Sequence, residues 1–543
     1  MGRIFNTVRF LFELFCEVSP GDNLREPYIT RKYPESYKNE EELKNIPKFT
    51  FPCHSFAQHY SFVLTSEDSK YTFCFCRYDP KANTAQVLLS HLPWHDIFYK
   101  LLNCIANLIN SPERGELSSF LEACHIRPPM PGHTLKVTYN AGHSVFTCQC
   151  PDNKLPSIPE NCNLTEYFSA MDTKCMAGLW AALLHERRVA IVATKPSRLS
   201  ACVQAANATL FPMSWQHIFI PILPKHLVDY LLAPMPFLIG VPRSVMESVR
   251  MSEIGDVVIL DVDANELRTP FNDLESLPSD LVSSLKKALS DKNALGDAVS
   301  RAFLRALVCL IGGYRDAIKI ENGQLITFNP EAFIRTRKNM QPFLKKILQS
   351  QIFRQFIDER LDLLNSGRGF NDEFEVECNH YADKLNTGSG QKLKQQYKDW
   401  AKNVKKEGGA FFKNMKDKVI VITGFLIPIL IICINMCFYK VIFVPVVFRS
   451  LIFVTFLYFI LIAILCSSSL SMMCSFFIPL LFIIDVVYFY SVYFTRVRSR
   501  SGDSSKENGC LKSITPKCIL CSTYLIFVYC VSLNHLRVLI FSF

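Results

Sequence analysis

The side chains best suited to chemistry in this sequence are a histidine–glutamate pair, a short glycine run and several cysteines. His185-Glu186 opens like the zinc pattern H-E-x-x-H, but no second histidine stands four residues after the first. Gly388-Ser389-Gly390 could cradle a phosphate, yet a polar stretch rather than a strand precedes it. The sequence contains no Walker loop, no G-x-G-x-x-G and no G-x-S-x-G. We therefore expect no catalytic residue, no bound cofactor and no ordinary enzyme.

Two pairs of cysteines, Cys74 with Cys76 and Cys148 with Cys150, would each share one face of a strand, because alternate residues point the same way. Zinc fingers use C-x-x-C spacing, so we favour core packing over a metal site. The total of 21 cysteines would suit a disulfide scaffold only in a short secreted chain. The first 17 residues carry charges that interrupt the apolar run of a signal peptide, at Arg3, Arg9, Glu13 and Glu17. A reduced, cytoplasmic protein is expected.

Charge is distributed unevenly along the 543 residues, and the net charge is +10. Nine of the 59 basic and three of the 49 acidic residues fall at 419–543, which leaves 50 basic and 46 acidic residues before that segment. Nucleic-acid binding requires a concentrated basic footprint, and none occurs in the first 390 residues. We expect no nucleic-acid partner.

The first part of the chain combines strand patterns with helices. Phe10–Val18 has the pattern of a strand, and Tyr60–Thr65 and Tyr71–Arg77 flank a polar turn, as in a hairpin. Apolar residues recur at helical spacing from Trp94 to Leu108, so this helix should cover one face of an antiparallel sheet. A second helix at 117–124 and strands at 134–139 and 144–148 follow. The order predicts an α+β module.

Prolines between Pro151 and Asn163 predict an extended linker, because a residue before proline disfavours helix. Beyond it, short apolar strands alternate with helices, which indicates an α/β module with a mostly parallel sheet. The expected strands are Val189–Ala193, Ile218–Leu223, Phe237–Val241 and Val257–Leu260, and the expected helices are Asp172–Leu184, Ser197–Leu210 and Lys225–Leu232. From Leu281 to about Gly367 the pattern is helical, with Ser279 or Asp280 as the first N-cap.

Several long strings of this sequence resemble DENN-domain proteins. The strings are residues 156–161 (PSIPEN) with 163–168 (NLTEYF), 215–224 (WQHIFIPILP), Tyr230, 233–240 (APMPFLIG), 256–261 (DVVILD) and 356–367 (FIDERLDLLNSG). They are far more specific than a short motif. The sequence is similar to the connecdenn subfamily over roughly residues 8–416.

That resemblance implies a longin-like upstream module, a central α/β DENN module and a helical downstream module. The chain then divides into residues 1–150 (upstream DENN module), 151–168 (linker), 169–278 (central DENN module), 279–390 (downstream DENN module), 391–418 (basic amphipathic helix) and 419–543 (hydrophobic tail). The resemblance also implies a guanine nucleotide exchange factor for a Rab-type small GTPase, the endocytic recycling Rab thirty-five, on clathrin-coated vesicles and endosomes. The alternative is a noncatalytic scaffold or membrane tether that binds a small GTPase.

An exchange factor needs a shaped surface rather than a catalytic pair, because it acts by binding. Open parallel sheets hold ligands beyond the carboxyl ends of their strands, and interfaces favour Trp, Tyr and Met. The GTPase-binding candidates are therefore Trp215, Asp229, Tyr230, Pro234, Met235 and Pro236. Trp215 and Tyr230 also suit a buried core, and the two prolines could simply fix the start of a strand. We expect His217 and His226 to be structural histidines rather than ligands.

A basic amphipathic segment precedes the tail. Its apolar stripe comprises Leu393, Tyr397, Trp400 and Val404, and six lysines surround it. Such a helix either lies on an anionic membrane surface or docks on the preceding helices and leaves its lysines in water. Both interpretations are open.

Two explanations of the tail are also open. Val419–Tyr439 has 21 uncharged residues, about 31 Å of helix, and Leu451–Met472 and Ser475–Phe494 could cross a membrane again. Three crossings would place Arg496, Arg498 and Arg500 opposite the lysines before the tail, against the positive-inside rule. The segment is therefore either an integral membrane anchor or a product of unspliced or out-of-frame translation. Because a polar tail of the usual kind is missing, binding to clathrin adaptors is doubtful.

Overall fold

The computed structural model describes residues 8–21, 26–52, 59–66, 70–111, 115–152, 154–291, 293–321, 325–384 and 395. Every described residue lies within Met1–Val419, which is one compact unit of the chain. The glycine run at 388–390, the expected basic helix apart from residue 395, and the tail at 419–543 lie outside the described residues. Within the described ranges, no helix is both long enough and apolar enough to span a bilayer.

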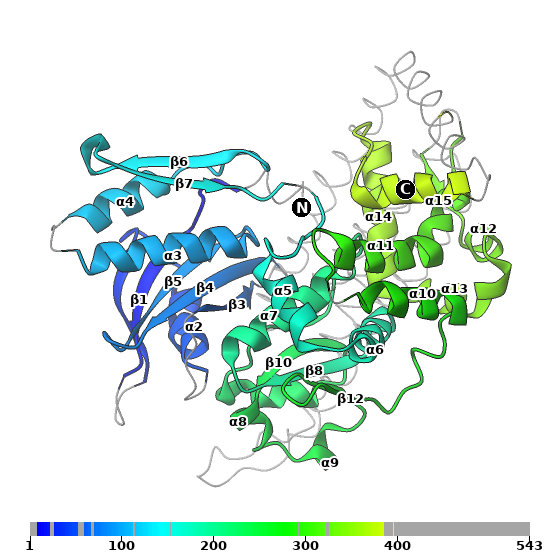
Figure 1. The fold of residues 1–543 in the computed structure, drawn as a ribbon, viewed down its shortest axis with the longest axis horizontal. Helices are drawn as coiled ribbons and strands as arrows, with labels where there is room; N and C mark the ends of the chain where they lie inside the picture. Colours follow the sequence, from blue (N-terminus) through cyan, green and yellow to red (C-terminus); the bar gives the residue numbers. More distant parts are fainter. Residues whose placement is uncertain are drawn as a thin grey trace, which may run out of the picture. The chain divides into compact units, whose positions relative to one another are not determined.

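As predicted, the upstream part of the described chain contains an antiparallel sheet (Figure 1); it has five strands, of which the two at 28–33 and 84–90 were not predicted. Its strands are β1 (Leu14–Ser19), β2 (Tyr28–Tyr33), β3 (His59–Thr65), β4 (Tyr71–Asp79) and β5 (Thr84–Ser90), in the order β2-β1-β5-β4-β3. The first strand starts at Leu14 rather than at Phe10, which corrects the prediction. The Leu11 amide donates to the Ile126 carbonyl and the Phe10 ring stacks on His125, so these residues join another segment.

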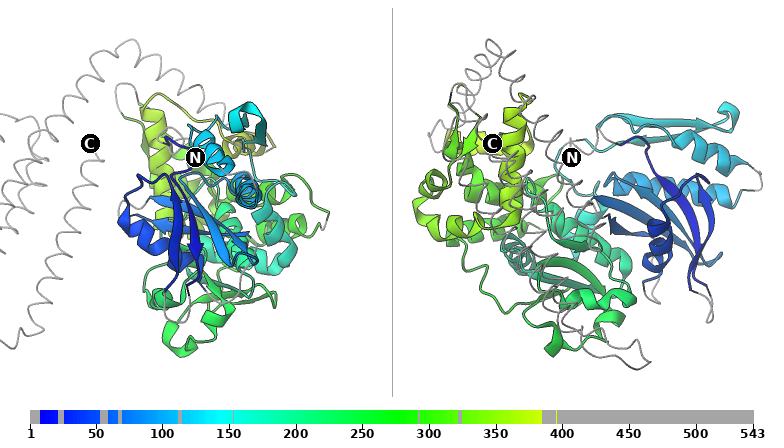
Figure 2. Two further views of the ribbon diagram at one scale, coloured as in Figure 1. Left: turned by 90° about the vertical axis from the view of Figure 1, so that its left-hand side faces the viewer. Right: turned by 180° about the vertical axis from the view of Figure 1, so that it is seen from behind.

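Helices cover both faces of this sheet (Figures 1 and 2). On one face lies α3 (His95–Ile109), whose Phe98 ring stacks on Phe75 of β4 at 4.5 Å, beside α4 (Glu116–Cys124) and the hairpin of β6 (Thr134–Tyr139) and β7 (Ser144–Gln149). The other face is covered by α2 (Glu40–Thr50), which the sequence pattern did not predict. Three glutamates and an internal proline obscure its apolar positions.

The central sheet has the order β12-β11-β8-β10-β9. Four of its strands run parallel, namely β8 (Arg188–Ala193), β9 (Ile218–Ile220), β10 (Phe237–Pro242) and β11 (Val258–Asp261), and β12 (Glu266–Arg268) is antiparallel. The parallel strands are almost fully buried, which explains their continuous apolar sequences. The short β12 is charged and half-exposed and was not predicted. On this sheet, α6 (Thr173–Leu184) packs against β11 and β12, and α7 (Pro196–Ala208) against β8 and β10.

Two predicted segments of the central region have a different structure. The linker expected at 151–168 ends in a helix, α5 (Cys162–Ala170), because the Asn161 side chain accepts a hydrogen bond from the Leu164 amide and caps it. The helix expected at 225–232 is a 3₁₀ helix, η2 (Lys225–Leu232), with Leu227 in a non-helical conformation. Two short helices, α8 (Arg243–Met246) and α9 (Met251–Ile254), connect β10 to β11.

The downstream part is helical, as predicted, with one short hairpin. It comprises α10 (Ser279–Leu289), α11 (Ala298–Ile311), η3 (Gly312–Ala317), β13 (Ile318–Lys319), β14 (Thr327–Phe328), α12 (Pro330–Arg335), η4 (Lys338–Met340), α13 (Gln341–Ile347), α14 (Gln351–Asn365) and α15 (Glu373–Lys384). The N-cap of α10 is Pro278, and Ser279 is already helical, so the predicted side-chain cap is not formed. The two-residue strands β13 and β14 are too short to give a sequence pattern.

The upstream and central sheets are joined by direct contacts between β3, α7 and β9. The Ser61 amide donates to Ser200 Oγ at 3.3 Å, and the rings of Tyr71 and Phe219 lie 5.7 Å apart. Buried residues of the two sheets belong to one continuous apolar cluster. The two modules therefore share a packed seam rather than a bare linker.

Candidate functional site

A largely apolar surface lies where the chain passes from η2 to β10. We call it the η2 patch and define it as Asp229, Tyr230, Leu232, Pro234, Met235 and Met251. The side chains of Tyr230, Leu232 and Met235 are 42%, 50% and 52% exposed, and Met251, on α9 packed beside η2, is 51% exposed. Neighbouring large apolar side chains with this exposure are typical of surfaces that bind another protein.

The η2 patch lies at the amino ends of the parallel strands, not at the carboxyl ends assumed in the prediction. Phe237, the first residue of β10, pairs with Arg188 and Ile218, the first residues of β8 and β9. The Arg188 Nη1 group donates to the carbonyl of Ala233 at 3.3 Å. A crossover leaves one strand at its carboxyl end and reaches the next at its amino end, so residues just before β10 must lie there.

The predicted candidates separate into exposed and buried residues. Asp229, Tyr230, Pro234 and Met235 are exposed, and Pro236 is half-buried directly before β10. Trp215 is only 3% exposed, and its indole N–H donates to the Ile218 carbonyl at 3.1 Å. This residue therefore shapes the start of β9 from within the core, the role that its sequence also allowed. Trp215 is not part of the η2 patch.

Leu232 and Met251 were not among the predicted candidates. Leu231 and Leu232 follow one another, and η2 buries only the first of them. Two successive leucines at the end of a short helix could have indicated one exposed apolar side chain. Met251 gives no such signal, because it reaches the patch only through the packing of α9 on η2.

Two histidines of this region make different contacts. His217 Nε2 lies 3.0 Å from Glu186 Oε1, a contact within the central module. His226, on η2, is exposed and meets the Phe49 ring of α2 edge-on at 6.4 Å. Since α2 belongs to the upstream module, the η2 patch begins beside the seam between the two sheets.

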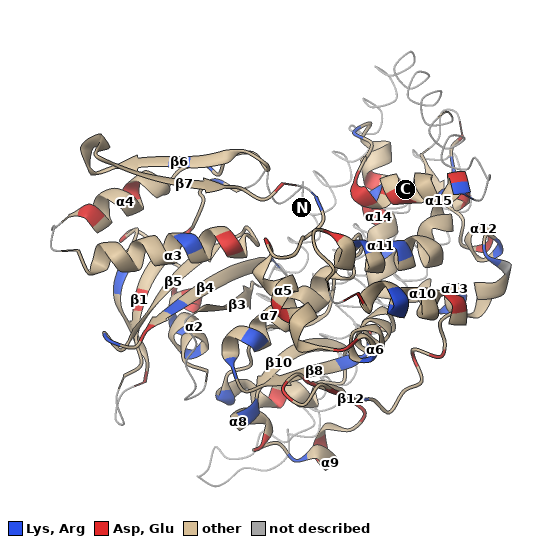
Figure 3. Cartoon of the chain, in the orientation of Figure 1, with Lys and Arg blue, Asp and Glu red and all other residues tan. Residues whose placement is uncertain are grey.

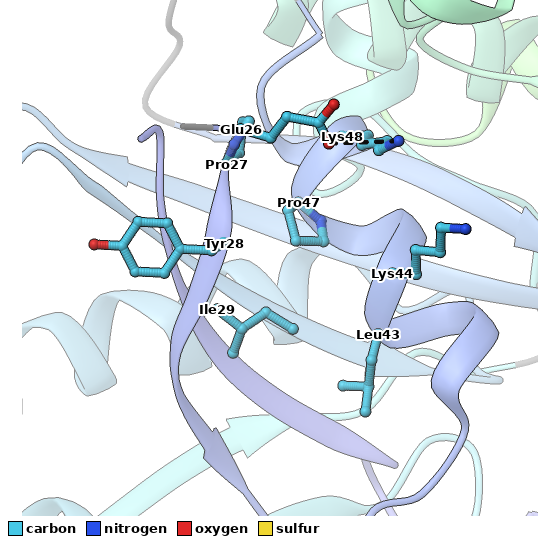
Figure 4. Close-up of a pocket in the computed structure, with 8 residues that line it drawn as sticks. All are labelled: Glu26, Pro27, Tyr28, Ile29, Leu43, Lys44, Pro47 and Lys48. Atoms are coloured by element: carbon cyan, nitrogen blue, oxygen red, sulfur yellow. Dashed lines mark ion pairs between the residues drawn. The ribbon is translucent and has the colours of Figure 1, made fainter. Parts of the chain in front are cut away.

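A pocket of about 300 Å³ opens on the upstream side of that seam, between β2 and α2 (Figure 4). Ile29 and Leu43 face each other across it, and Lys48 closes one end through an ion pair with Glu26 at 3.6 Å. The neighbouring Phe49 is the residue that contacts His226. The pocket and the η2 patch thus flank the seam from the two modules.

The carboxyl ends of the parallel strands are occupied by an internal network of charged groups. The amide and hydroxyl of Thr194 donate to Asp263 Oδ2 at 2.7 and 2.8 Å, and Arg243 Nη2 donates to Asp261 Oδ1 at 2.5 Å. Burial alone would raise the pKa of both carboxyls, but these hydrogen bonds lower it. Asp263 therefore holds the position before α7 where many parallel-sheet proteins bind an anion.

Ser276, His185 and Asp273 meet beside the α6–β8 turn, which the sequence does not reveal. Ser276 Oγ lies 3.0 Å from His185 Nε2. His185 Nδ1, however, is 2.9 Å from the Ala181 carbonyl and 3.9 Å from Asp273, whose carboxylate is bound by two hydrogen bonds from Arg187. A backbone carbonyl therefore orients the imidazole, and the carboxylate serves the arginine. This arrangement is not that of a hydrolytic triad.

Groups of three or more His, Cys, Asp or Glu that could hold a metal ion do not occur among the described residues. Cys74 and Cys76 are fully buried, and burial raises the pKa of both thiols well above the usual value. The core interpretation of this pair is confirmed. Cys148 and Cys150 are also buried, within the apolar cluster under α3. Basic and acidic positions are interspersed over the described elements (Figure 3).

Comparison with known proteins identifies three family models on this chain. The uDENN domain matches residues 27–78, the DENN (AEX-3) domain residues 81–265 and the dDENN domain residues 328–377. The first covers part of the upstream sheet and α2, the second includes the whole η2 patch, and the third falls on α12 to α15. The three models occur in the order expected from the resemblance.

Full-length relatives show the same relationship. The chain is 44% identical to mouse DENN domain-containing protein 1A over 436 residues, which covers 77% of this chain and 41% of the relative. It is 45% identical to the Xenopus laevis protein 1A over 423 residues, or 75% of this chain and 40% of the relative, and 42% identical to mouse DENN domain-containing protein 1B over 422 residues, or 76% and 53%. The chain thus spans about two-fifths to half of these relatives. It belongs to the DENN-domain family, in the group of DENN domain-containing protein 1.

Proposed function

We propose that this chain is a guanine nucleotide exchange factor that promotes GDP release from a Rab-type small GTPase. Membership of the DENN-domain family supports the proposal, because DENN proteins act on Rab GTPases. The observation that carries it is the η2 patch, an exposed apolar surface within the DENN match and beside the seam with the upstream module. Tyr and Met at such a surface are side chains that protein interfaces favour.

Exchange requires no covalent chemistry from the protein. A factor that binds the GTPase more tightly without nucleotide must, by linkage, weaken nucleotide binding by the same ratio. The ratio of the two affinities depends on which surface of the GTPase is bound. Rigid side chains on a well-packed sheet are suited to binding one surface selectively. The buried strands next to the η2 patch and the packed seam supply that rigidity.

The proposed substrate is the endocytic recycling Rab thirty-five, on endocytic vesicles and endosomes. The similarity to DENN domain-containing proteins 1A and 1B supports this choice. The protein would work as a peripheral factor at an anionic membrane surface, or as an integral one if the tail is a genuine anchor. Clathrin adaptors are not proposed as partners.

The experiment follows release of fluorescent GDP from purified Rab proteins after addition of the full chain. Met235→Asp should slow release at least tenfold, because truncation of a central interface residue costs about 2 kcal/mol or more and 1.4 kcal/mol is a factor of ten. Its thermal unfolding should change little, since exposed positions usually alter stability by about 0.5 kcal/mol or less.

Leu295→Asp is the matched control. Leu295 is 70% exposed on the loop between α10 and α11, outside the η2 patch, so this change should leave both release and unfolding unaltered. Unfolding of the Met235 variant would assign that side chain to the core. Binding of the wild-type chain without acceleration, across a panel of Rab proteins, would favour the scaffold alternative.

A further inference from the structure

The turn between α6 and β8 adopts a backbone conformation that its sequence does not favour. α6 ends in a Schellman motif, in which the Arg187 amide donates to the Ala182 carbonyl at 3.1 Å and the Glu186 amide to the Leu183 carbonyl at 3.0 Å. The residue that follows the helix in this motif, Glu186, has a left-handed backbone conformation with a φ of 50°. Glycine is favoured there, because a Cβ is strained at positive φ. A glutamate at this position indicates a compensating role of its side chain.

The Glu186 carboxylate caps a helix of the downstream part. Its Oε1 atom accepts hydrogen bonds from the amides of Gln351 and Ile352, the first two residues of α14, each at 2.9 Å. Ser350, the N-cap residue, accepts from the third amide, that of Phe353. The first turn of α14 is therefore satisfied by one local side chain and one from the central module. The negative charge also suits the positive end of the helix dipole.

The same turn holds the segment that carries the η2 patch, at two points. Glu186 Oε1 lies 3.0 Å from His217 Nε2, immediately before β9, and β9 leads into η2. Two residues further along the chain, Arg188 donates to the Ala233 carbonyl at 3.3 Å and to the Asp256 carbonyl at 3.1 Å. Ala233 lies between Leu232 and Pro234 of the η2 patch. Glu186 and Arg188 thus connect α14 with the chain from His217 to Ala233, which we call the patch segment.

The electrostatics of Glu186 agree with this geometry. Its side chain is only 14% exposed, and burial by itself would raise the pKa of the carboxyl. The contact with His217 and the two amide hydrogen bonds outweigh burial, so the pKa is lowered. The carboxylate is charged at neutral pH, and its partners are fixed backbone groups and one imidazole.

We infer that the turn Glu186–Arg188 couples the downstream helices to the η2 patch, with Glu186 as a positioning residue that holds α14 and the start of β9 together. The downstream part would then regulate the patch without contacting the partner. The coupling of this turn to GDP release rests on the proposed exchange function, whereas its structural part stands on the contacts above. Melting and hydrogen exchange test the structural part, and GDP release tests the coupling to function.

The test compares Glu186→Gly with Ala141→Gly in the full chain. Ala141 also has a positive φ, of 51°, and is exposed in the β6–β7 turn, so glycine relieves the same backbone strain there without removing a carboxylate. A purely local role of Glu186 predicts that both glycine variants melt at or above the wild-type temperature. The inferred role predicts a melting temperature lower by several degrees for Glu186→Gly only.

Hydrogen exchange then locates the effect. Amide exchange of Gln351 and Ile352 should accelerate at least tenfold in Glu186→Gly, and amides from Ile218 to Ala233 should accelerate with them. Glu186→Gln keeps an acceptor oxygen but not the charge, so it should give intermediate protection and remain folded. Faster exchange confined to α14 would overturn the coupling, and unchanged exchange at both places would overturn the cap.

Release of fluorescent GDP from the Rab protein completes the test. Glu186→Gly should lower the maximal release rate severalfold more than Ala141→Gly, with Glu186→Gln between them. An undiminished rate together with a loosened patch segment would overturn the regulatory role. If the wild-type chain releases no GDP, the proposed function fails, and the exchange of the patch amides still decides whether Glu186 couples the two parts.

Discussion

At the scale of single residues, His95 at the start of α3 is a buried titratable group outside the η2 patch. It is 6% exposed, its Nδ1–H lies 3.2 Å from the Pro93 carbonyl, and its ring meets Phe75 edge-on at 5.1 Å. Its Nε2 atom is buried, with no hydrogen-bond partner in the part of the chain that the structure describes. A proton on that atom would therefore be unsatisfied. Burial lowers the pKa of His95 from 6.5 to about 4.

This pKa predicts loss of stability in mild acid. The unfolded chain binds a proton at His95 below about pH 6.5 and the folded chain only near pH 4, so the free energy of unfolding falls as the pH drops through this interval. The loss should reach roughly 3 kcal/mol near pH 4. His95→Leu should flatten that part of the profile in urea denaturation between pH 7 and 4. A variant with the wild-type slope would show that another group titrates.

The sequence left open whether Trp215 and Tyr230 are contact or core residues, and the structure separates them. Tyr230 and Met235 are exposed because a 3₁₀ helix and a proline-rich turn hold the chain at the surface. Trp215 has the composition of a contact residue, yet a hydrogen bond to a carbonyl three residues away keeps it in the core. Whether an aromatic side chain is a contact or a core residue depends on its neighbours in space, which one sequence does not give.

At the scale of elements, Gly240 shows how closely β10 is packed against the segment that precedes η2. The Leu223 amide donates to the Gly240 carbonyl at 2.7 Å. A Cβ on Gly240 would overlap the Pro221 carbonyl oxygen and lie 3.0 Å from Val203 Cγ2. The Pro221 carbonyl oxygen cannot move away from β10 without disturbing the hydrogen bond between the Leu223 amide and the Gly240 carbonyl.

Gly240→Ala should therefore destabilise the protein by about 1–3 kcal/mol, the usual cost of overpacking a core. The displaced segment leads into η2. The variant should therefore also accelerate GDP release from the Rab protein less than the wild-type chain does, at a temperature where both are folded. Thermal unfolding by circular dichroism and the release assay check the two effects. Unchanged melting would mean that the segment from Pro221 to Leu223 is not held against β10.

Most elements were predictable because their apolar periodicity is strong. The stripe of α3 and the buried strands of the central sheet are examples. Two helices were missed because local signals opposed them: α2 is rich in charge and contains Pro47, and α5 follows three prolines.

The wrong placement of the candidate site had another cause. The carboxyl-end rule is sound for ligands of open sheets, but here those ends are filled by Arg243, Asp261 and Asp263.

At the scale of the whole molecule, the upstream sheet, central sheet and downstream helices are connected by specific contacts rather than by linkers alone. Ser61 and Ser200 join the two sheets, and Glu186 joins the central sheet to α14. The order of the modules was predictable from the resemblance to DENN proteins. The joints were not, because each pairs residues more than a hundred positions apart.

The exchange function requires that the chain and GDP weaken each other's binding to the same GTPase. The direct measurement is the dissociation constant of the full chain for the Rab protein, by titration calorimetry, first without nucleotide and then with excess GDP. We predict at least tenfold weaker binding with GDP, the same factor by which the chain weakens GDP binding, because linkage is reciprocal. Equal affinity in the two states, or tighter binding to the GTP-loaded form, would contradict exchange and make the chain a scaffold.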